Sequence, residues 1–291
     1  MKRIQLKSGK DIPFILYSPA LIWQVLFLLV PLGLTIFFSA VEWVDVSRFT
    51  VATWNNYAAV CNLVHARIIL RSALLSLGTV FVTFLLAYPV AYFLALRLRR
   101  FKNVFLFLLT LPFWVNFLIL VYAWLFLLEH NGVFNAGLMY LGFISQPLDI
   151  ANNLIAVFIV MVYCYLPFII MPIYTSLGKI DDRIFEASAD LGAKPWQTFT
   201  RITLPLSFSG ISTGLLLVMV PAFGELAIPL MVGGSKEMMV GSLISHYFFV
   251  VRDNGLGAAF TIVSGLVLVF LALSIHYSMR FLIRKFGKEG S

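Results

Sequence analysis

Two carboxylates lie at the ends of long apolar segments, where a charged group is unusual. Glu225 follows a proline and a glycine near the end of one segment, and another segment ends at Glu129 after the aromatic residues Trp114, Tyr122 and Trp124. Carboxylates pair with ammonium groups, and aromatic faces attract them by cation–π interaction. This combination indicates a pathway site for an organic cation. An interfacial carboxylate at a helix end, flanked by an aromatic belt, accounts for the same residues.

Patterns for catalysis, metal binding or ATP binding are missing from the sequence. The histidines are scattered without an HExxH pair, and Cys61 and Cys164 form no CxxC or Cys/His cluster. A P-loop needs Gly-Lys followed by Ser or Thr, whereas the Gly-Lys pairs here precede Asp, Ile and Glu. We therefore expect a chain that is not an enzyme and has no catalytic residue, no metal site and no cofactor of its own.

The elements that hold these residues are membrane helices. The chain has 61% apolar and only 12% charged residues, against about 25% charged in a soluble domain. A helix of about twenty apolar residues crosses the hydrocarbon core. The sequence predicts an all-α membrane protein with six transmembrane helices, approximately at residues 20–40, 72–96, 104–128, 154–177, 207–228 and 258–279.

The net charge of +8 reflects membrane topology. Sixteen of the 21 lysines and arginines fall on one side of the predicted helices, in the two chain ends and in the second and fourth loops. By the positive-inside rule both termini are cytoplasmic, and no nucleic-acid partner is needed to explain the charge. The predicted organisation is a tail at 1–19, a six-helix transmembrane domain at 20–279 and a tail at 280–291, in contact with membrane lipid.

Some predicted helices carry features that affect packing. Prolines inside them, such as Pro112 and Pro221, remove backbone donors and favour bent helices. Gly210 and Gly214 form a GxxxG pair on one helical face, which favours close helix packing in a bilayer. Bent helices occur both in ordinary bundles and in proteins with a movable pathway.

The fourth loop, residues 181–205, predicts two short helices on the cytoplasmic side. Asp181 and Asp182 are suited to cap a helix start, and apolar residues then recur at helical spacing. Gly192 is a natural helix terminator and Pro195 fits the first turn of a second helix. A rigid amphipathic pair of this kind is suited to insertion into a groove on a partner protein.

This loop resembles the EAA loop of bacterial ABC importer permeases. The family pattern is E-A-A, three residues, G, nine residues, I, one residue, L-P. The chain matches its spacing throughout, with a serine in place of the second alanine, at Glu186, Ala187, Ser188, Gly192, Ile202, Leu204 and Pro205. The resemblance implies the MetI-like fold of type I ABC importers and assigns these residues to coupling with an ATPase.

Other stretches resemble the permeases of spermidine/putrescine importers, including Leu111–Asn116, Tyr165–Phe168 and Pro221–Glu225. The likeness is greatest to the first of the two permease subunits of such systems. It implies a second homologous permease, two ATPase subunits that bind ATP and Mg, an extracytoplasmic binding protein that delivers polyamine, and a bacterial inner-membrane location. Related permeases import iron(III), sulfate or phosphonate, so these solutes stay open.

Two other classes of membrane protein are less consistent with the sequence. An intramembrane enzyme needs a catalytic cluster within a span, and a secondary transporter does not need an EAA loop. The third loop has no lysine or arginine and carries Glu129 and Asp149, so it would present an electronegative outer face to a polycation.

Overall fold

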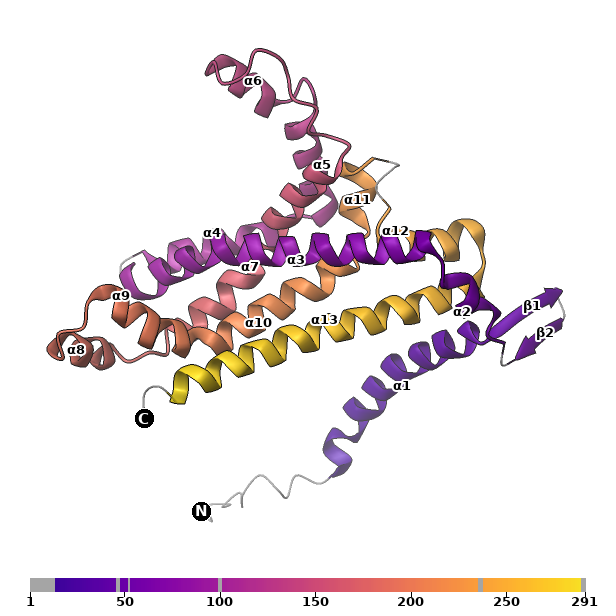
Figure 1. Cartoon of the computed structure of the whole chain (residues 1–291), viewed down its shortest axis with the longest axis horizontal. Coiled ribbons are helices and arrows are strands. Elements are labelled where there is room, and N and C mark those ends of the chain that lie inside the picture. Colours follow the sequence, from indigo (N-terminus) through magenta and orange to yellow (C-terminus); the bar gives the residue numbers. More distant parts are fainter. Residues whose placement is uncertain (1–13, 46–47, 52, 99–100, 235–237, 289–291) are drawn as a thin grey trace, which may run out of the picture.

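The computed structural model describes residues 14–45, 48–51, 53–98, 101–234 and 238–288. Apart from one small hairpin, the described elements are helical (Figure 1). In chain order they are α1 (Phe14–Ser39), β1 (Val41–Asp45), β2 (Arg48–Val51), α2 (Asn55–Val60), α3 (Leu63–Tyr92), η1 (Phe93–Arg97), α4 (Lys102–Trp114), α5 (Phe117–Leu128), α6 (Val133–Tyr140), α7 (Leu154–Leu177), α8 (Asp182–Asp190), α9 (Pro195–Thr198), η2 (Phe199–Thr203), α10 (Leu204–Phe223), α11 (Ala227–Val232), α12 (Val240–Ser245), η3 (His246–Val251) and α13 (Asn254–Lys288). The η elements are π-helical turns.

Six helical segments in the described chain are long and apolar enough to cross a membrane, which confirms the predicted number. They are Pro19–Ser39, Leu63–Arg97, Phe117–Tyr140, Leu154–Leu177, Pro195–Phe223 and Asn254–Ile283. Most of the predicted spans lie within or overlap these segments. The all-α expectation holds for the bundle, and the β1–β2 hairpin is an addition that the sequence analysis did not anticipate.

The predicted third span, 104–128, is two helices rather than one. Helix α4 ends at Trp114, Val115 is extended, and Asn116 begins α5 by accepting the Leu118 N–H at 2.9 Å. Pro112 contributes to the break because it removes one backbone donor of α4. As a result α5 and α6 project away from the bundle (Figure 1).

The predicted chain ends are only partly described. Residues 1–13 of the predicted tail 1–19 lie outside the described chain, as do residues 289–291. Several of the lysines and arginines counted for the topology are also outside the described chain, namely those within residues 1–13, Arg99, Arg100 and Lys236. Helix α13 extends through Lys288, so most of the predicted tail 280–291 continues this helix. Cytoplasmic placement of the termini stays a prediction.

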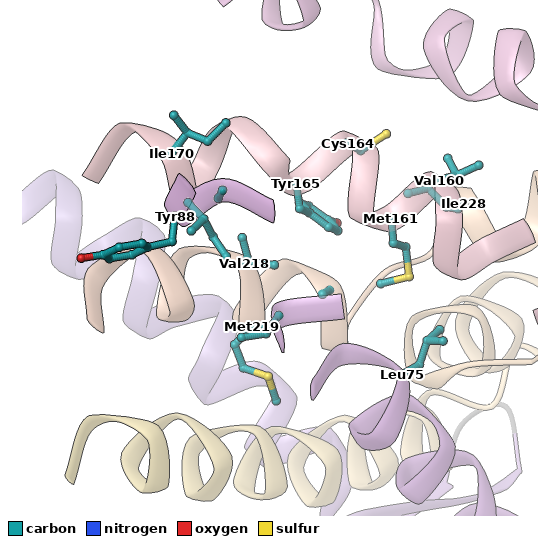
Figure 2. Packing of buried hydrophobic residues seen from close by; sticks show 14 of the residues in the cluster. Leu75, Tyr88, Val160, Met161, Cys164, Tyr165, Ile170, Val218, Met219 and Ile228 are labelled. Atoms are coloured by element: carbon teal, nitrogen blue, oxygen red, sulfur yellow. The ribbon is translucent and has the colours of Figure 1, made fainter. Parts of the chain in front are cut away.

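Helices α3, α7 and α10 form the centre of the bundle, and α10 also packs on α13. Their facing sides supply most of the buried apolar side chains (Figure 2). The GxxxG glycines bring α10 close to α7. A Cβ added at Gly210 would lie 2.5 Å from the Pro172 carbonyl oxygen, and one at Gly214 would lie 3.2 Å from the Ile169 Cα. The predicted close packing at these glycines is therefore present.

The two ends of the bundle carry different elements. Helices α8 and α9 lie at the end where α13 finishes, and the hairpin, α2 and α12 lie at the other (Figure 1). At this second end the Asn56 side chain donates to the Val41 carbonyl at 2.9 Å, and His65 Nε2 lies 2.5 Å from the Tyr247 hydroxyl. Helix α1 packs chiefly on α13, and most of its apolar side chains are exposed.

Candidate functional site

The loop at 181–205, called the EAA loop below, folds as two short helices. The Asp181 carboxylate accepts the Arg183 N–H at 3.0 Å and caps α8. After α8 the chain turns at Gly192, whose φ of +73° is in the left-handed region that favours glycine. Helix α9 begins at Pro195. The predicted capping, turn and helix pair are confirmed.

Ser188 joins the two helices of the EAA loop. Its side chain is 5% exposed, and its hydroxyl lies 2.8 Å from that of Thr198. Alanine, the residue of the family pattern, cannot make this hydrogen bond. Glu186 and Ala187 lie on the exposed part of α8.

The EAA loop exposes three large apolar side chains among charged and polar ones. The exposed fractions are 87% for Leu191, 72% for Trp196 and 40% for Ile184. Leu191 and Trp196 lie at the turn between α8 and α9, and Ile184 lies in the first turn of α8. Large apolar side chains gathered at such a tip are typical of a surface that binds another protein. We call this surface, Ile184 with Leu191 and Trp196, the knob.

Phe199 connects the knob to the bundle. Its ring stacks on Trp196 with centroids 5.5 Å apart and makes edge contacts with Tyr88 at 5.8 Å and Tyr92 at 6.0 Å, both on α3. The remaining residues of the pattern lie just beyond Phe199, with Ile202 in η2 and with Leu204 and Pro205 in the first turn of α10. The knob is therefore connected to α3 through Phe199 and to α10 through η2.

Glu225 lies at a break between two helices. Helix α10 ends at Phe223 and α11 begins at Ala227, so the predicted span 207–228 is interrupted here. The Glu225 side chain is 8% exposed. Its Oε1 accepts the backbone N–H groups of Leu226 at 3.1 Å, Ala227 at 3.0 Å and Ile228 at 3.3 Å, and its Oε2 accepts the hydroxyl of Tyr165. The carboxylate is thus buried and hydrogen-bonded within the chain.

The aromatic residues predicted with Glu225 do not surround it. Trp114 is 77% exposed at the end of α4, and Tyr122 is 52% exposed on α5. Trp124 packs against Tyr163 of α7, with ring centroids 4.9 Å apart. The partners of the Glu225 carboxylate are Tyr165 and backbone amides. A pathway role for Trp114, Tyr122 and Trp124 stays a prediction.

Glu129 ends α5 and is exposed, at the base of a loop with an internal hydrogen-bond network. Asn135, 1% exposed, donates to the carbonyl of Glu129 at 3.3 Å and accepts the Leu148 N–H at 3.0 Å. His130 Nδ1 lies 2.8 Å from the Asp149 carboxylate, so one of the two acidic groups predicted to face a polycation has a local partner.

Sequence reasoning missed the residue that contacts Glu225 from a second helix. Tyr165 lies within the stretch that resembles polyamine permeases, but no role was assigned to it. It is 5% exposed and projects from α7 into the bundle (Figure 2). A phenol in the middle of a strongly apolar span was the available signal, because a buried hydroxyl needs a hydrogen-bond partner.

The sequence model of the family described as "Binding-protein-dependent transport system inner membrane component" matches residues 87–288, which include the EAA loop and Glu225. This chain belongs to that family. The permease is therefore a multi-pass protein of the bacterial inner membrane.

Curated relatives of the permease align over nearly its whole length. It is 35% identical over 288 residues to the spermidine/putrescine transport system permease protein PotB of Haemophilus influenzae, covering 98% of each chain. It is 37% identical over 268 residues to PotB of Escherichia coli, covering 92% of the permease and 98% of the relative. These relatives are themselves named as transport permeases rather than as enzymes.

The fold agrees with solved ABC importers. The permease superposes on a chain of a bacterial alginate ABC transporter with a TM-score of 0.74 at 15% identity. That crystal structure shows the transporter in complex with a periplasmic protein that binds alginate pentasaccharide. The superposition covers 93% of the permease and 94% of that chain. The expected type I importer fold is confirmed by this likeness, which concerns the fold and not the solute.

Proposed function

We propose that this chain is a permease subunit of an ATP-driven importer that carries polyamines, such as spermidine and putrescine, across the bacterial inner membrane. The observation that carries the proposal is its identity of 35% and 37% to two PotB permeases of spermidine/putrescine transport systems, over at least 92% of the chain. The buried Glu225 carboxylate supports a cationic solute, because an anion would meet a like charge there.

The chain would work as part of a larger complex. Its proposed partners are a second homologous permease, two ATPase subunits and an extracytoplasmic binding protein that delivers polyamine. ATP and Mg would be bound and used by the ATPase subunits, and this chain would take no part in the hydrolysis. The exposed Leu191 and Trp196 of the knob support docking to the ATPase, because their burial in a partner groove would be favourable.

The structure suggests how ATPase movement would reach the transport pathway. Closure of the ATPase subunits would displace the knob, and Phe199 would pass this displacement to α3 through Tyr88 and Tyr92. Because η2 continues directly into α10, the same displacement would reach the helix break at Glu225. Rigid helices that shift together in this way would alternate access between the two sides of the membrane.

The residues proposed to contact the solute lie on two parts of the chain. Glu225 would supply the negative charge at the α10–α11 break. Trp114, Tyr122, Trp124 and Glu129 would line the pathway along α4 and α5, where exposed aromatic faces favour methylene chains and ammonium groups. Coverage of α4 and α5 by the second permease would complete that wall.

Uptake by the reconstituted complex tests the proposed function. The permease is placed in proteoliposomes with its second permease, ATPase subunits and binding protein, and labelled putrescine, spermidine, iron(III), sulfate and phosphonate are offered separately. We expect ATP-dependent uptake of the two polyamines alone. Uptake of an anion or of iron(III) without polyamine uptake would overturn the substrate assignment, and uptake without ATP would overturn the importer assignment.

A further inference from the structure

Glu225 is a carboxylate buried at the break between α10 and α11. Its side chain is 8% exposed, and one of its oxygens accepts three backbone N–H groups. No lysine, arginine or histidine in the described ranges forms an ion pair with it. Within the described ranges, the partners of the carboxylate are three backbone N–H groups and one hydroxyl. A buried carboxylate of this kind favours the arrival of a positive group.

The two oxygens of this carboxylate have different roles. Oε1 accepts three N–H groups at the start of α11, so it fixes the carboxylate to the break between α10 and α11. Oε2 is bound by the hydroxyl of Tyr165, which comes from α7. The contacts of Oε1 lie within one short stretch of chain, whereas the contact of Oε2 depends on the relative position of two helices. Oε2 is therefore the oxygen that can change partners during transport.

We propose that the Tyr165 hydroxyl is a built-in substitute for a substrate ammonium group. A primary ammonium of the polyamine takes its place on Oε2, while Oε1 keeps its backbone partners. The inference rests on the proposed function and identifies one contact of the same pathway. The exchange replaces a hydrogen bond from a neutral hydroxyl with an ion pair, in which donor and acceptor carry opposite charges.

Burial of both partners links the exchange to helix movement. Tyr165 is 5% exposed, so an ammonium reaches Oε2 only when α7 and the α10–α11 break move apart. In this structure the Tyr165 hydrogen bond is one of the contacts between α7 and the α10–α11 break. The substrate then competes with a contact that holds the pathway closed, so Tyr165 sets both the affinity for polyamine and the ease of opening.

Removal of the hydroxyl tests this competition. We compare the complex carrying Tyr165→Phe with one carrying Tyr174→Phe, a matched control on the same helix, whose hydroxyl forms no hydrogen bond among the described residues. Two quantities are measured. The first is the concentration of labelled spermidine that half-saturates the complex in the absence of the binding protein. The second is the rate of ATP hydrolysis by the complex in the absence of spermidine. Tyr165→Phe should lower the first by about fivefold, the equivalent of one ordinary hydrogen bond, and raise the second. Tyr174→Phe should change neither.

Removal of the charge gives the opposite result. Glu225→Gln should raise the half-saturating spermidine concentration at least tenfold, and adding Tyr165→Phe should not restore it. An unchanged or increased concentration for Tyr165→Phe alone overturns the proposal. The proposal is also overturned if Tyr165→Phe lowers the half-saturating spermidine concentration in the Glu225→Gln background as well. The hydroxyl would then act somewhere other than on Glu225.

A second measurement keeps the hydroxyl and does not depend on a variant that folds poorly. The complex carries 3-fluorotyrosine at position 165, and its ¹⁹F resonance is recorded with spermidine and with the uncharged 1,4-butanediol. Spermidine should shift the resonance and butanediol should not. A complex that transports polyamine without this shift overturns the inference alone. A complex that transports no polyamine overturns the proposed function.

Discussion

The hydroxyl groups of Ser188 and Thr198 lie 2.8 Å apart and join the two short helices of the EAA loop. Ser188 is nearly fully buried, so its hydrogen bond is shielded from water. This bond helps to fix the angle between α8 and α9, and with it the position of the knob. The docking surface is therefore formed before a partner binds, which lowers the conformational cost of docking.

Replacement of Ser188 by alanine should have a small effect. One hydrogen bond contributes about 0.5–1.5 kcal/mol, and the Thr198 hydroxyl keeps a second acceptor in the Lys194 carbonyl at 3.5 Å. We expect uptake within twofold of the wild type for Ser188→Ala and loss of ATPase copurification for Ser188→Leu, which has no space between the helices. Equal damage by both substitutions would contradict this account.

Substitutions at Gly192 should separate backbone strain from steric blocking. An added Cβ meets nothing within 4 Å, but a residue with φ of +73° costs about 1–2 kcal/mol for most side chains. Asparagine tolerates this conformation, so Gly192→Asn should retain ATPase copurification. Gly192→Trp should insert into the membrane but reduce both copurification and uptake by at least tenfold. Normal uptake in the tryptophan variant would exclude docking at this turn.

Phe199 and Trp196 should have separable roles although their rings are stacked. Trp196 is exposed, so Trp196→Ala should weaken ATPase copurification. Phe199 contacts Tyr88 and Tyr92, so Phe199→Ala should keep copurification and lower the amount of polyamine moved per ATP hydrolysed by about fivefold. The stability cost should be less than the 3–5 kcal/mol of a fully buried Phe→Ala change. The ratio of uptake to ATP hydrolysis, measured in proteoliposomes, distinguishes the two variants.

The two glycines of the GxxxG pair should differ in how well they tolerate substitution by alanine. At Gly210 an added Cβ would lie 2.5 Å from a backbone oxygen and 2.6 Å from the Ser176 Cβ, so α10 must move away from α7. A Cβ added at Gly214 would lie 3.2 Å from its nearest neighbouring atom. Overpacking costs roughly 1–3 kcal/mol, and we expect Gly210→Ala near the upper end and Gly214→Ala near the lower. Thermal unfolding in detergent measures the order, and the reverse order would contradict the packing described.

Much of the fold was predictable because its signals are local. Long apolar runs predict the six spans, and Asp181, Gly192 and Pro195 predict the helices and the turn of the EAA loop. The break before α5 also had local signals in Pro112 and Asn116, but the apolar run around them concealed it. The β1–β2 hairpin was missed because its strands are only five and four residues long and lie next to a much longer apolar segment.

The candidate site was less predictable because its contacts cross the chain. Pro221 and Gly224 indicate a helix break near Glu225, and the structure has this break between α10 and α11. The partner of Glu225, Tyr165, lies on another helix, so sequence spacing contains no information about their contact. The same holds for Phe199, whose partners Tyr88 and Tyr92 are on α3.

The pairing of α1 with α13 has a consequence for biogenesis. Helix α1 leaves the ribosome before every other helix described here, yet its chief packing partner is made after all of them. During translation α1 must therefore remain in the bilayer as a single helix, held by lipid or by the insertion machinery. A chain that is cut short before α13 leaves this helix unpaired, and such a fragment is a natural target for membrane proteases.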